Sequence, residues 1–222
     1  MKIQEKVFFT QQREEMLQGQ ITARGVRNPF VLQAMREIPR HLFMPHNVRD
    51  RAYDDCPLPI GKGQTISQPY IVAYMTECLQ LLGGERVLEI GSGRGYQAAV
   101  LSRIAARVYT VERIPELAAQ AQQTFAALGL TNIEIRTGDG TLGWEEKAPF
   151  EAIVVTASGP DIPEPLKRQL TINGRLVMPV GSLHHGQQIL RVTRTDDDAF
   201  TTEYLLQVAF VPLLGKFGWK EA

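Results

Sequence analysis

Residues 86–97, which read RVLEIGSGRGYQ, constrain the fold of this chain more than any other stretch. A short apolar run that contains Glu89 leads directly into Gly91, Gly93 and Gly95, and a helix-compatible run follows. This pattern is typical of a buried strand, a tight glycine turn and a helix N-terminus, which together cradle nucleotide-like ligands. Glycine permits the positive φ angles and the close backbone approach that such a cradle needs. A turn that only joins a strand to a helix is the alternative.

The glycine spacing argues against a dinucleotide cofactor. The dinucleotide fingerprint is G-x-G-x-x-G, whereas this chain has G-x-G-x-G with Glu89 two residues before the first glycine. A carboxylate there would repel a diphosphate, but it suits a ligand that carries an ammonium and a sulfonium group. The pattern E-x-G-x-G resembles motif I of the S-adenosylmethionine-dependent methyltransferases. We therefore expect S-adenosylmethionine as the cofactor, bound by Glu89, Gly91 and Gly93.

Composition is that of an ordinary globular protein, and it excludes several function classes. The chain has 222 residues, enough for one well-cored domain, and 44% of them are hydrophobic. Lys and Arg together number 24, as do Asp and Glu, so charge gives no argument for nucleic acid or an anionic membrane. The two cysteines form no metal-ligand spacing and no disulfide framework. The N-terminus has no signal-peptide core, so we expect a cytoplasmic protein.

Strand-like and helix-like segments alternate from residue 86 to residue 180, which predicts a parallel sheet with helices on both faces. Segments 189–195 and 202–210 flank a run of aspartates and predict an antiparallel hairpin at the sheet edge. We expect an α/β fold with a Rossmann-like, doubly wound, mostly parallel sheet of about seven strands. The expected strands are 86–90, 108–111, 133–136, 150–156, 175–180, 189–195 and 202–210, and the expected helices are 1–24, 29–38, 67–82, 97–106, 115–128 and 163–170.

The first seventy residues are expected to add a helical and loop extension over the active site. Residues 1–24 predict a surface helix whose apolar stripe includes Val7, Phe8, Leu17 and Ile21. The following helix ends at a proline, and the next thirty or so residues show no periodicity, although their apolar side chains indicate an ordered, packed segment. We expect a single domain over 1–222, made of an N-terminal helical and lid segment (1–70), a cofactor-binding core (71–210) and a tail (211–222).

Acidic residues mark three successive predicted strands. Glu89 lies in the first, Glu112 ends the second, and Asp139 with Gly140 ends the third. In an open parallel sheet the ligand lies beyond the carboxyl ends of the strands, so these residues are expected to meet. Glu112 can accept hydrogen bonds from both ribose hydroxyls, and Asp139 can accept one from an adenine amino group beside the backbone of Gly140. Each acid alone is more often a solvated loop charge, but together they predict a nucleoside ligand.

No residue near the predicted strand ends is an evident general base. His41, His46, His184 and His185 lie far from these ends in the sequence, and a surface or capping role is expected for each. The chain also lacks the Asn/Asp-Pro-Pro-aromatic motif expected of methyltransferases that act on exocyclic base amines. A carboxylate acceptor needs no base, because a pKa of about 4 leaves it ionised at neutral pH. The enzyme has only to align the carboxylate with the methyl group and exclude water.

Residues 57–72, PLPIGKGQTISQPYIV, closely resemble the signature segment of the protein-L-isoaspartate O-methyltransferases, including the run GQTISQP. Other parts of the chain resemble further blocks of that family in the family's order, and together they cover roughly residues 30–215. These blocks are IPRHLF, VLEIGSGRGYQ, VERI, GDG, APFEAIVVTA, LVMPVG and FVPL. The first 25 or so residues match no pattern of the family, and 159–161 depart from it, which leaves the peptide side-chain preference open.

The resemblance implies methyl transfer from S-adenosylmethionine to the free carboxylate of an L-isoaspartyl residue or to the side-chain carboxylate of D-aspartate. The methyl ester then closes to a succinimide, whose hydrolysis returns some normal aspartate. The family's active-site serine falls on Ser67, which would donate a hydrogen bond to the acceptor carboxylate. Ser67 is alternatively the N-cap of the next helix. Thr65 is a plausible second donor, and backbone near Thr156 and Val211 is expected to hold the peptide as an extended strand.

Three other functions remain as alternatives. A methyltransferase acting on a small molecule or RNA is disfavoured by the TIS segment and the absent base. A cofactor-binding regulatory protein without catalysis is disfavoured because Ser67 accompanies the three acids, and an NAD-dependent oxidoreductase is disfavoured by the glycine spacing. We expect a monomer that acts on isoaspartyl proteins and peptides, releases S-adenosylhomocysteine, uses no metal, and binds neither nucleic acid nor membrane. The order of the last two strands in the sheet is not predicted.

Overall fold

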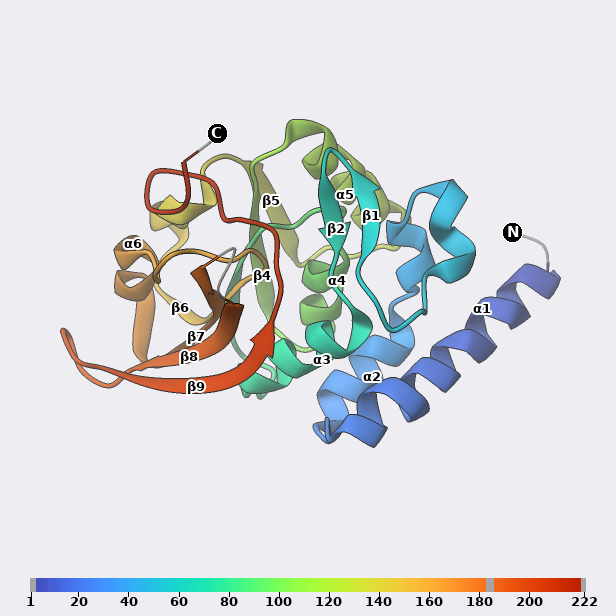
Figure 1. The fold of residues 1–222 in the computed structure, drawn as a ribbon, viewed down its shortest axis with the longest axis horizontal. Coiled ribbons are helices and arrows are strands. Elements are labelled where there is room, and N and C mark those ends of the chain that lie inside the picture. The colour runs from blue at the N-terminus through green and yellow to red at the C-terminus, as the bar shows by residue number, and fades with distance from the viewer. Residues whose placement is uncertain (1–2, 183–185, 221–222) are drawn as a thin grey trace.

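A seven-stranded mixed sheet forms the centre of the computed structural model, which describes residues 3–182 and 186–220 (Figure 1). The strands lie in the order β5-β4-β3-β6-β7-β8-β9; pairs from β5 to β7 are parallel, and β7, β8 and β9 pair antiparallel. The expected mostly parallel α/β sheet with a C-terminal antiparallel part is thereby confirmed. The strands are β3 (Arg86–Ile90), β4 (Arg107–Glu112), β5 (Ile133–Thr137), β6 (Phe150–Val155), β7 (Leu170–Ser182), β8 (Gly186–Arg194) and β9 (Phe200–Val208).

The direction in which the chain builds the sheet reverses between β3 and β6. From β3 the chain proceeds outward through β4 to β5, and it then returns to β6 on the other side of β3. These two strands pair in parallel, with Ile90 opposite Val155 at their carboxyl ends. Ligands of open α/β sheets bind in the crevice outside this kind of reversal, so the topology alone places the candidate site here.

Helices cover the two faces of the sheet unequally. Val87, Val108 and Val154 belong to one large core shared with the N-terminal helices, α3, α4 and α5. Leu88 and Ile153 belong to a second core, on the face covered by the short α6, by 3-10 turns and by the C-terminal tail. The helices are α1 (Ile3–Met16), α2 (Pro29–Glu37), α3 (Pro69–Cys78), α4 (Tyr96–Ser102), α5 (Pro115–Ala127) and α6 (Glu164–Arg168), and none of the described helices is long and apolar enough to cross a membrane.

The apolar stripe of the first helix differs from the prediction at its N-terminal end. Leu17 and Ile21 are buried as expected, but Val7 and Phe8 are exposed, and Phe9 takes their place in the core. Successive helical residues are rotated by about 100°, so Phe8, nine positions before Leu17, points to the opposite side of the helix. Phe9, the next residue, is rotated about 100° from Phe8 and so lies on the side of Leu17. The predicted helix over 1–24 is also divided, since α1 ends at Met16 and Leu17–Ile21 form a π-helix. Figure 1 shows α1 on the outside of the molecule.

The segment between α2 and α3 is packed, as expected, but it also contains structure that the sequence did not reveal. Two 3-10 turns, Arg40–Phe43 and His46–Arg51, precede a hairpin of β1 (Leu58–Gly61) and β2 (Gln64–Ile66). The Lys62 ammonium at the hairpin tip lies 2.5 Å from a Glu116 carboxylate oxygen at the start of α5. The hairpin therefore reaches across the carboxyl ends of the sheet.

Strand β7 is longer than predicted. Asn173 and Gly174 are expected to turn the chain into a strand at 175–180, but β7 runs from Leu170 to Ser182 and includes both residues. Asn173 has a φ of 64°, and the register with β6 shifts beside it, so the Asn-Gly pair forms a bulge within the strand. Helices α3 and α4 end at Cys78 and Ser102, before the predicted ends at 82 and 106.

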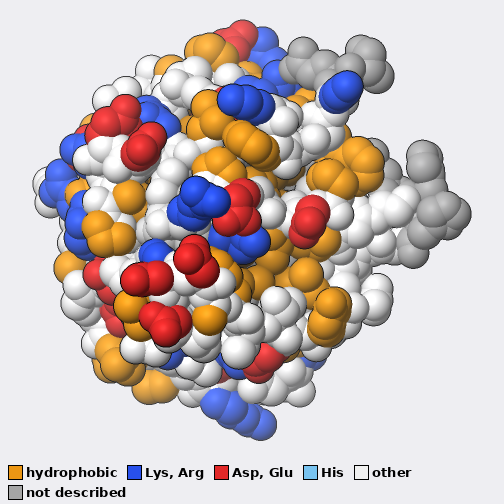
Figure 2. Space-filling view, turned by 90° about the vertical axis from the view of Figure 1, so that its left-hand side faces the viewer, with side chains coloured by type: hydrophobic (Ala, Val, Ile, Leu, Met, Phe, Trp, Pro, Cys, Tyr) orange, Lys and Arg blue, Asp and Glu red, His pale blue; other side chains and the backbone are white. Residues whose placement is uncertain are grey.

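Charged side chains of both signs are mixed on the face of the molecule that Figure 2 shows. Lys and Arg side chains lie among Asp and Glu side chains, with hydrophobic side chains between them. The chain has 24 basic and 24 acidic residues, and on this face they do not form a large region of one charge sign.

Candidate functional site

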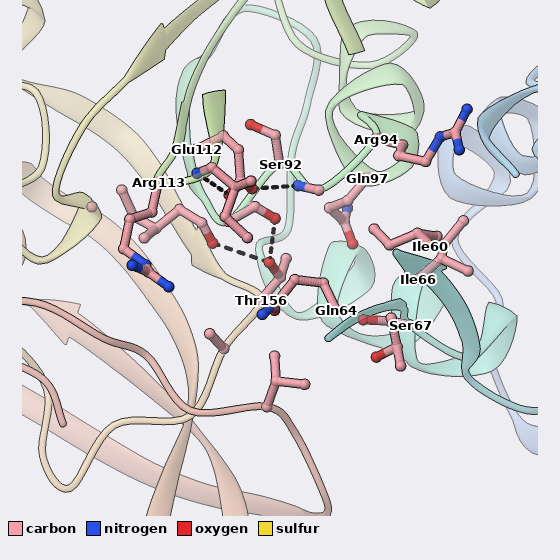
Figure 3. Close-up of a pocket in the computed structure, with 18 of the residues that line it drawn as sticks. Ile60, Gln64, Ile66, Ser67, Ser92, Arg94, Gln97, Glu112, Arg113 and Thr156 are labelled. Atoms are coloured by element: carbon pink, nitrogen blue, oxygen red, sulfur yellow. Dashed lines mark hydrogen bonds between the residues drawn. The ribbon is translucent and has the colours of Figure 1, made fainter. Parts of the chain in front are cut away.

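A cavity opens at the carboxyl ends of β3, β4 and β6, where the sheet reverses its order (Figure 3). One wall is the glycine turn after β3 with the first residues of α4. The β1/β2 hairpin forms the opposite wall, and residues 211–214 of the tail close a third side. The site is therefore assembled from segments that lie far apart in the sequence.

The glycine turn adopts a backbone that other residues rarely take. Gly91, Gly93 and Gly95 have φ angles of 94°, 54° and 98°. A Cβ atom on Gly91 would lie 2.5 Å from the Thr156 hydroxyl oxygen, and one on Gly95 would lie 2.5 Å from the Phe125 ring. The predicted tight glycine turn between a strand and a helix is confirmed, since both the φ angles and the surrounding atoms require glycine; its role as a ligand cradle stays a prediction.

Thr156 joins the ends of the two central strands. Its hydroxyl donates to the backbone oxygen of Gly91 at 2.6 Å, and the same hydroxyl oxygen lies 3.1 Å from the backbone oxygen of Ile90. Its backbone N–H also donates to the Ile90 oxygen. Thr156 lines the cavity, so it braces the glycine turn and forms part of the wall at the same time.

Glu112 presents its carboxylate to the cavity from the end of β4. One carboxylate oxygen accepts from the Gly93 backbone N–H at 2.7 Å, and the other accepts from the Ile114 N–H at 2.9 Å. Burial raises the pKa of Glu112, while these backbone hydrogen bonds act in the opposite sense. Each carboxylate oxygen retains capacity for a further hydrogen bond, so Glu112 can accept from ligand hydroxyls.

Glu89 lies beneath the glycine turn and does not line the cavity. Its side chain is fully buried, and one oxygen accepts from the Thr110 hydroxyl, which also contacts the Ser92 hydroxyl. The other oxygen has no hydrogen-bond partner among the described residues. Burial raises the pKa of Glu89 to about 8, which disfavours the carboxylate form at neutral pH. The structure thus places this carboxyl group where it ties β3 to β4, away from the space a ligand would fill.

Asp139 also points away from the cavity, whereas Gly140 lines it. One Asp139 oxygen accepts from the Thr141 N–H and hydroxyl, and the other accepts from the Lys216 N–H at 2.8 Å. Partial burial opposes ionisation, but these hydrogen bonds outweigh it and lower the pKa of Asp139. The carboxylate joins the turn after β5 to the C-terminal tail, and the adenine contact expected of it stays a prediction.

Ser67 lies in the hairpin wall, across the cavity from Glu112 (Figure 3). Its backbone oxygen accepts from the buried Arg40 guanidinium at 2.8 Å, while its hydroxyl forms no hydrogen bond with any described residue. The N-cap residue of α3 is Gln68, and no side chain caps this helix. The structure therefore shows no capping contact for Ser67. Thr65 lines the cavity beside Ser67.

Val211 belongs to a tail segment that runs along the end of β6. Its backbone oxygen accepts from the Ser158 N–H at 2.8 Å, and the Ser158 oxygen accepts from the Leu213 N–H. These two bonds form a short parallel bridge between the chain after β6 and the tail. The tail is therefore held as extended backbone at the rim of the cavity.

Neither His41 nor His46 lines the cavity, where a catalytic base would have to lie. His41, expected at the surface or in a cap, is instead buried: its ring stacks on Phe9 at 4.0 Å, and its Nδ1 lies 2.9 Å from the Tyr53 hydroxyl. Burial, followed by the charges of two nearby arginines, lowers the pKa of His41 to about 4. His46 is exposed and does not line the cavity, and His184 and His185 lie outside the described residues.

Several cavity residues were not predicted from the sequence. The hairpin residues among them could not be placed, because the hairpin itself gave no periodic signal. Gln97 had a usable signal, since it is the second residue of the helix that follows the glycine turn. No group of three or more His, Cys, Asp or Glu side chains in the described part of the chain is arranged to hold a metal. The unpredicted lining residues are Ile60, Gln64, Ile66, Val72, Ser92, Arg94, Tyr96, Gln97, Arg113, Ile114, Ala157, Pro212, Leu213 and Leu214, with the strand ends Ile90 and Val111.

Comparison with known proteins points to one family. A family model described as protein-L-isoaspartate(D-aspartate) O-methyltransferase (PCMT) matches residues 11–218. Protein-L-isoaspartate O-methyltransferase 1 of Rhodopseudomonas palustris is 59% identical over 95% of this chain and 86% of its own length. Protein-L-isoaspartate O-methyltransferase 2 of Pelobacter propionicus is 56% identical over 93% of this chain and 92% of its own length.

Solved structures show the same fold. A protein-L-isoaspartate O-methyltransferase superposes with a TM-score of 0.83 and 31% identity, covering 93% of this chain and 67% of that one. A Plasmodium falciparum protein superposes with a TM-score of 0.79 and 24% identity, covering 91% of this chain and 98% of that one. The second structure is described as a complex with S-adenosyl-L-homocysteine.

Proposed function

Because the chain belongs to the protein-L-isoaspartate(D-aspartate) O-methyltransferase family, we infer that its cavity holds S-adenosylmethionine and an acceptor carboxylate side by side. The protein transfers a methyl group to the free carboxylate of L-isoaspartyl and D-aspartyl residues in damaged proteins and peptides, which initiates repair through a succinimide. The observation that carries this conclusion is the family match over 11–218, a range that includes every residue of the cavity wall.

The cofactor end of the cavity is the part formed by β3 and β4. We propose that Glu112 accepts hydrogen bonds from the ribose hydroxyls, and that the glycine turn packs against the methionyl part of S-adenosylmethionine. Gly140 lines this end of the cavity, and the wall requires glycine there, because a Cβ would clash with the Ile90 side chain; we propose that the adenine ring lies beside it. When bound, the cofactor supplies the electrophilic methyl group. We also propose that the enzyme is a cytoplasmic monomer and that it uses no metal.

Replacing Glu112 with alanine is expected to weaken S-adenosylhomocysteine binding by about 1.5–3 kcal/mol, because a charged hydrogen bond to the ribose is lost. Isothermal titration calorimetry measures the dissociation constant directly. Glu145→Ala, which removes an exposed carboxylate outside the cavity wall, is the matched control and should leave the constant unchanged. A normal constant for Glu112→Ala would remove the ribose assignment.

The acceptor end of the cavity is the part formed by the hairpin and the tail. We propose that the Ser67 hydroxyl donates a hydrogen bond to the acceptor carboxylate, with Thr65 as a second donor. Its role is to orient the carboxylate for in-line attack, and the already ionised acceptor needs no base. The extended backbone at Val211, together with that at Thr156, offers an edge along which a substrate peptide can lie as a strand.

Ser67→Ala is expected to lower turnover by roughly 10- to 100-fold while S-adenosylhomocysteine affinity stays within about twofold. The hydroxyl forms no hydrogen bond with the described chain, so its loss removes a substrate contact and little else. Initial rates of methyl transfer and calorimetric affinities distinguish the two effects. Ser102→Ala, on α4 outside the cavity wall, should behave as wild type. Normal turnover with about 1 kcal/mol lost stability would instead assign Ser67 to the helix cap.

Methyl transfer to paired peptides tests the function as a whole. The two peptides differ only in an isoaspartyl or an aspartyl linkage, and labelled S-adenosylmethionine is the donor. Base-labile label on the isoaspartyl peptide alone is the expected result, because a carboxyl methyl ester hydrolyses in base. Transfer to neither peptide by a protein that still binds the cofactor would overturn the proposed acceptor.

A further inference from the structure

Gln97 is the second residue of α4, and its side chain points from the glycine-turn wall into the cavity (Figure 3). The residue is only 6% exposed. A buried amide in a ligand cavity has a donor end and an acceptor end, and a ligand meets only the end that is turned toward it. The neighbours of Gln97 determine which end that is.

A chain of hydrogen bonds fixes the amide of Gln97 in one orientation. The Thr76 hydroxyl donates to the Val72 backbone oxygen at 2.7 Å, and the Gln97 side-chain amide lies 2.8 Å from the same Thr76 oxygen. A hydroxyl has one hydrogen, and here Val72 takes it, so Thr76 can only accept from Gln97. The NH₂ group of Gln97 must therefore face Thr76, and Oε1 must face the cavity.

The wall around Gln97 offers no carboxylate for a ligand cation. Glu112 is the one acidic residue among the described residues of the cavity wall, and it lies at the end of β4. Glu89, the acid expected from the sequence to attract an ammonium group, is buried beneath the turn. An ammonium group bound beside the glycine turn needs a neutral acceptor, and the amide oxygen of Gln97 is one.

We propose that Gln97 Oε1 accepts a hydrogen bond from the α-ammonium group of the methionyl part of S-adenosylmethionine. This inference rests on the proposed function, and it names the residue that makes the cavity specific for the amino-acid end of the cofactor. A neutral amide suits this place, because a carboxylate would also repel the neighbouring methionyl carboxylate. Thr76 does not touch the cofactor; it is a positioning residue that holds the amide in the productive orientation.

Binding of matched ligands to the full-length protein tests this assignment. The ligands are S-adenosylhomocysteine, its analogue without the α-amino group, and 5′-methylthioadenosine, which lacks the amino-acid part. Wild type is expected to prefer S-adenosylhomocysteine over the deaminated analogue by about 10- to 100-fold. Gln97→Leu should remove most of that preference while 5′-methylthioadenosine binds within about twofold of wild type. Thr76→Val, which releases the amide, should reduce the preference in part.

The outcomes separate this inference from the function on which it rests. Equal losses of affinity for S-adenosylhomocysteine and its deaminated analogue in Gln97→Leu would overturn the ammonium contact and leave the cofactor assignment intact. Failure of wild type to bind S-adenosylhomocysteine at all would overturn both. If Gln97→Leu no longer binds 5′-methylthioadenosine, its cavity is disturbed and Thr76→Val decides: an unchanged preference in that variant overturns the proposal.

Discussion

Gly91→Ala is expected to lower the free energy of unfolding by about 3 kcal/mol or more and to abolish measurable S-adenosylhomocysteine binding. Gly91 has a φ of 94°, where an alanine is strained by about 1–2 kcal/mol. The added Cβ would lie 2.5 Å from the Thr156 hydroxyl oxygen, which donates to the backbone oxygen of Gly91. Relieving this clash breaks that hydrogen bond and moves the turn that forms the cavity wall. Urea unfolding and calorimetry measure the two effects.

Gly84→Ala is the matched control, because nothing lies within 4 Å of a Cβ placed there and its φ is not in the left-handed region. Its stability should stay within about 0.5 kcal/mol of wild type. The double variant Gly91→Ala/Thr156→Ala separates the clash from the backbone strain. It should be more stable than the sum of the single effects predicts, since the clashing oxygen is gone. Purely additive effects would show that strain alone accounts for the loss.

The parallel half of the sheet could be predicted because its signals are local. Phe150–Val155 is an almost uninterrupted apolar run, which a strand buried on both faces requires. The run that ends at Ile90 leads into glycines at alternate positions, which neither a helix nor a strand interior favours, so a tight turn is expected there. Alternation of such strands with amphipathic helices leaves few topologies, since parallel crossovers are right-handed.

The hairpin over the cavity could not be predicted in the same way. Leu58–Gly61 and Gln64–Ile66 are too short to show an alternating pattern. Their position depends on distant partners, among them Glu116, whose carboxylate meets the Lys62 ammonium. Lys62 and Glu116 are 54 positions apart in the sequence, and no local sequence pattern predicts a contact between residues so far apart.

The sequence predicted which residues lie near the cavity better than it predicted where their side chains point. Glu89 and Glu112 both belong to strands that end at the cavity, yet Glu112 is the last residue of its strand and Glu89 is the penultimate one. The terminal side chain can turn toward the Gly93 N–H, whereas the inner one is fully buried and accepts from the Thr110 hydroxyl of the neighbouring strand. The position of Gln97 after the glycine turn could have been predicted, whereas the direction of its amide depends on the hydroxyl of Thr76, a residue on another helix.

Stability is expected to fall by about 2 kcal/mol as the pH rises from 6.5 to 8, and Glu89→Gln should remove this fall. Burial raises the pKa of Glu89 from its usual 4.5 to about 8, so between these values the native state binds a proton that the unfolded chain has released. Unfolding then becomes easier with rising pH until the native carboxyl group also ionises. Over the whole window the linkage reaches at most about 5 kcal/mol. Urea unfolding curves at several pH values give the profile.

The titration of His41 limits the pH range in which the effect of Glu89 on stability can be measured. Burial lowers the pKa of His41 to about 4 from 6.5, so the unfolded chain binds the extra proton and stability rises with pH between these values. This rise opposes the fall from Glu89 below pH 6.5. Only about 0.4 kcal/mol of it remains above pH 6.5, so the larger fall from Glu89 dominates the interval from 6.5 to 8. Glutamine imitates the protonated carboxyl group without titrating, so the Glu89→Gln profile should be nearly flat there and lie above wild type, by a larger margin at pH 8 than at pH 6.5. Parallel profiles for the two proteins would show that Glu89 ionises normally, and the buried carboxyl group would then have to be charged in the native state.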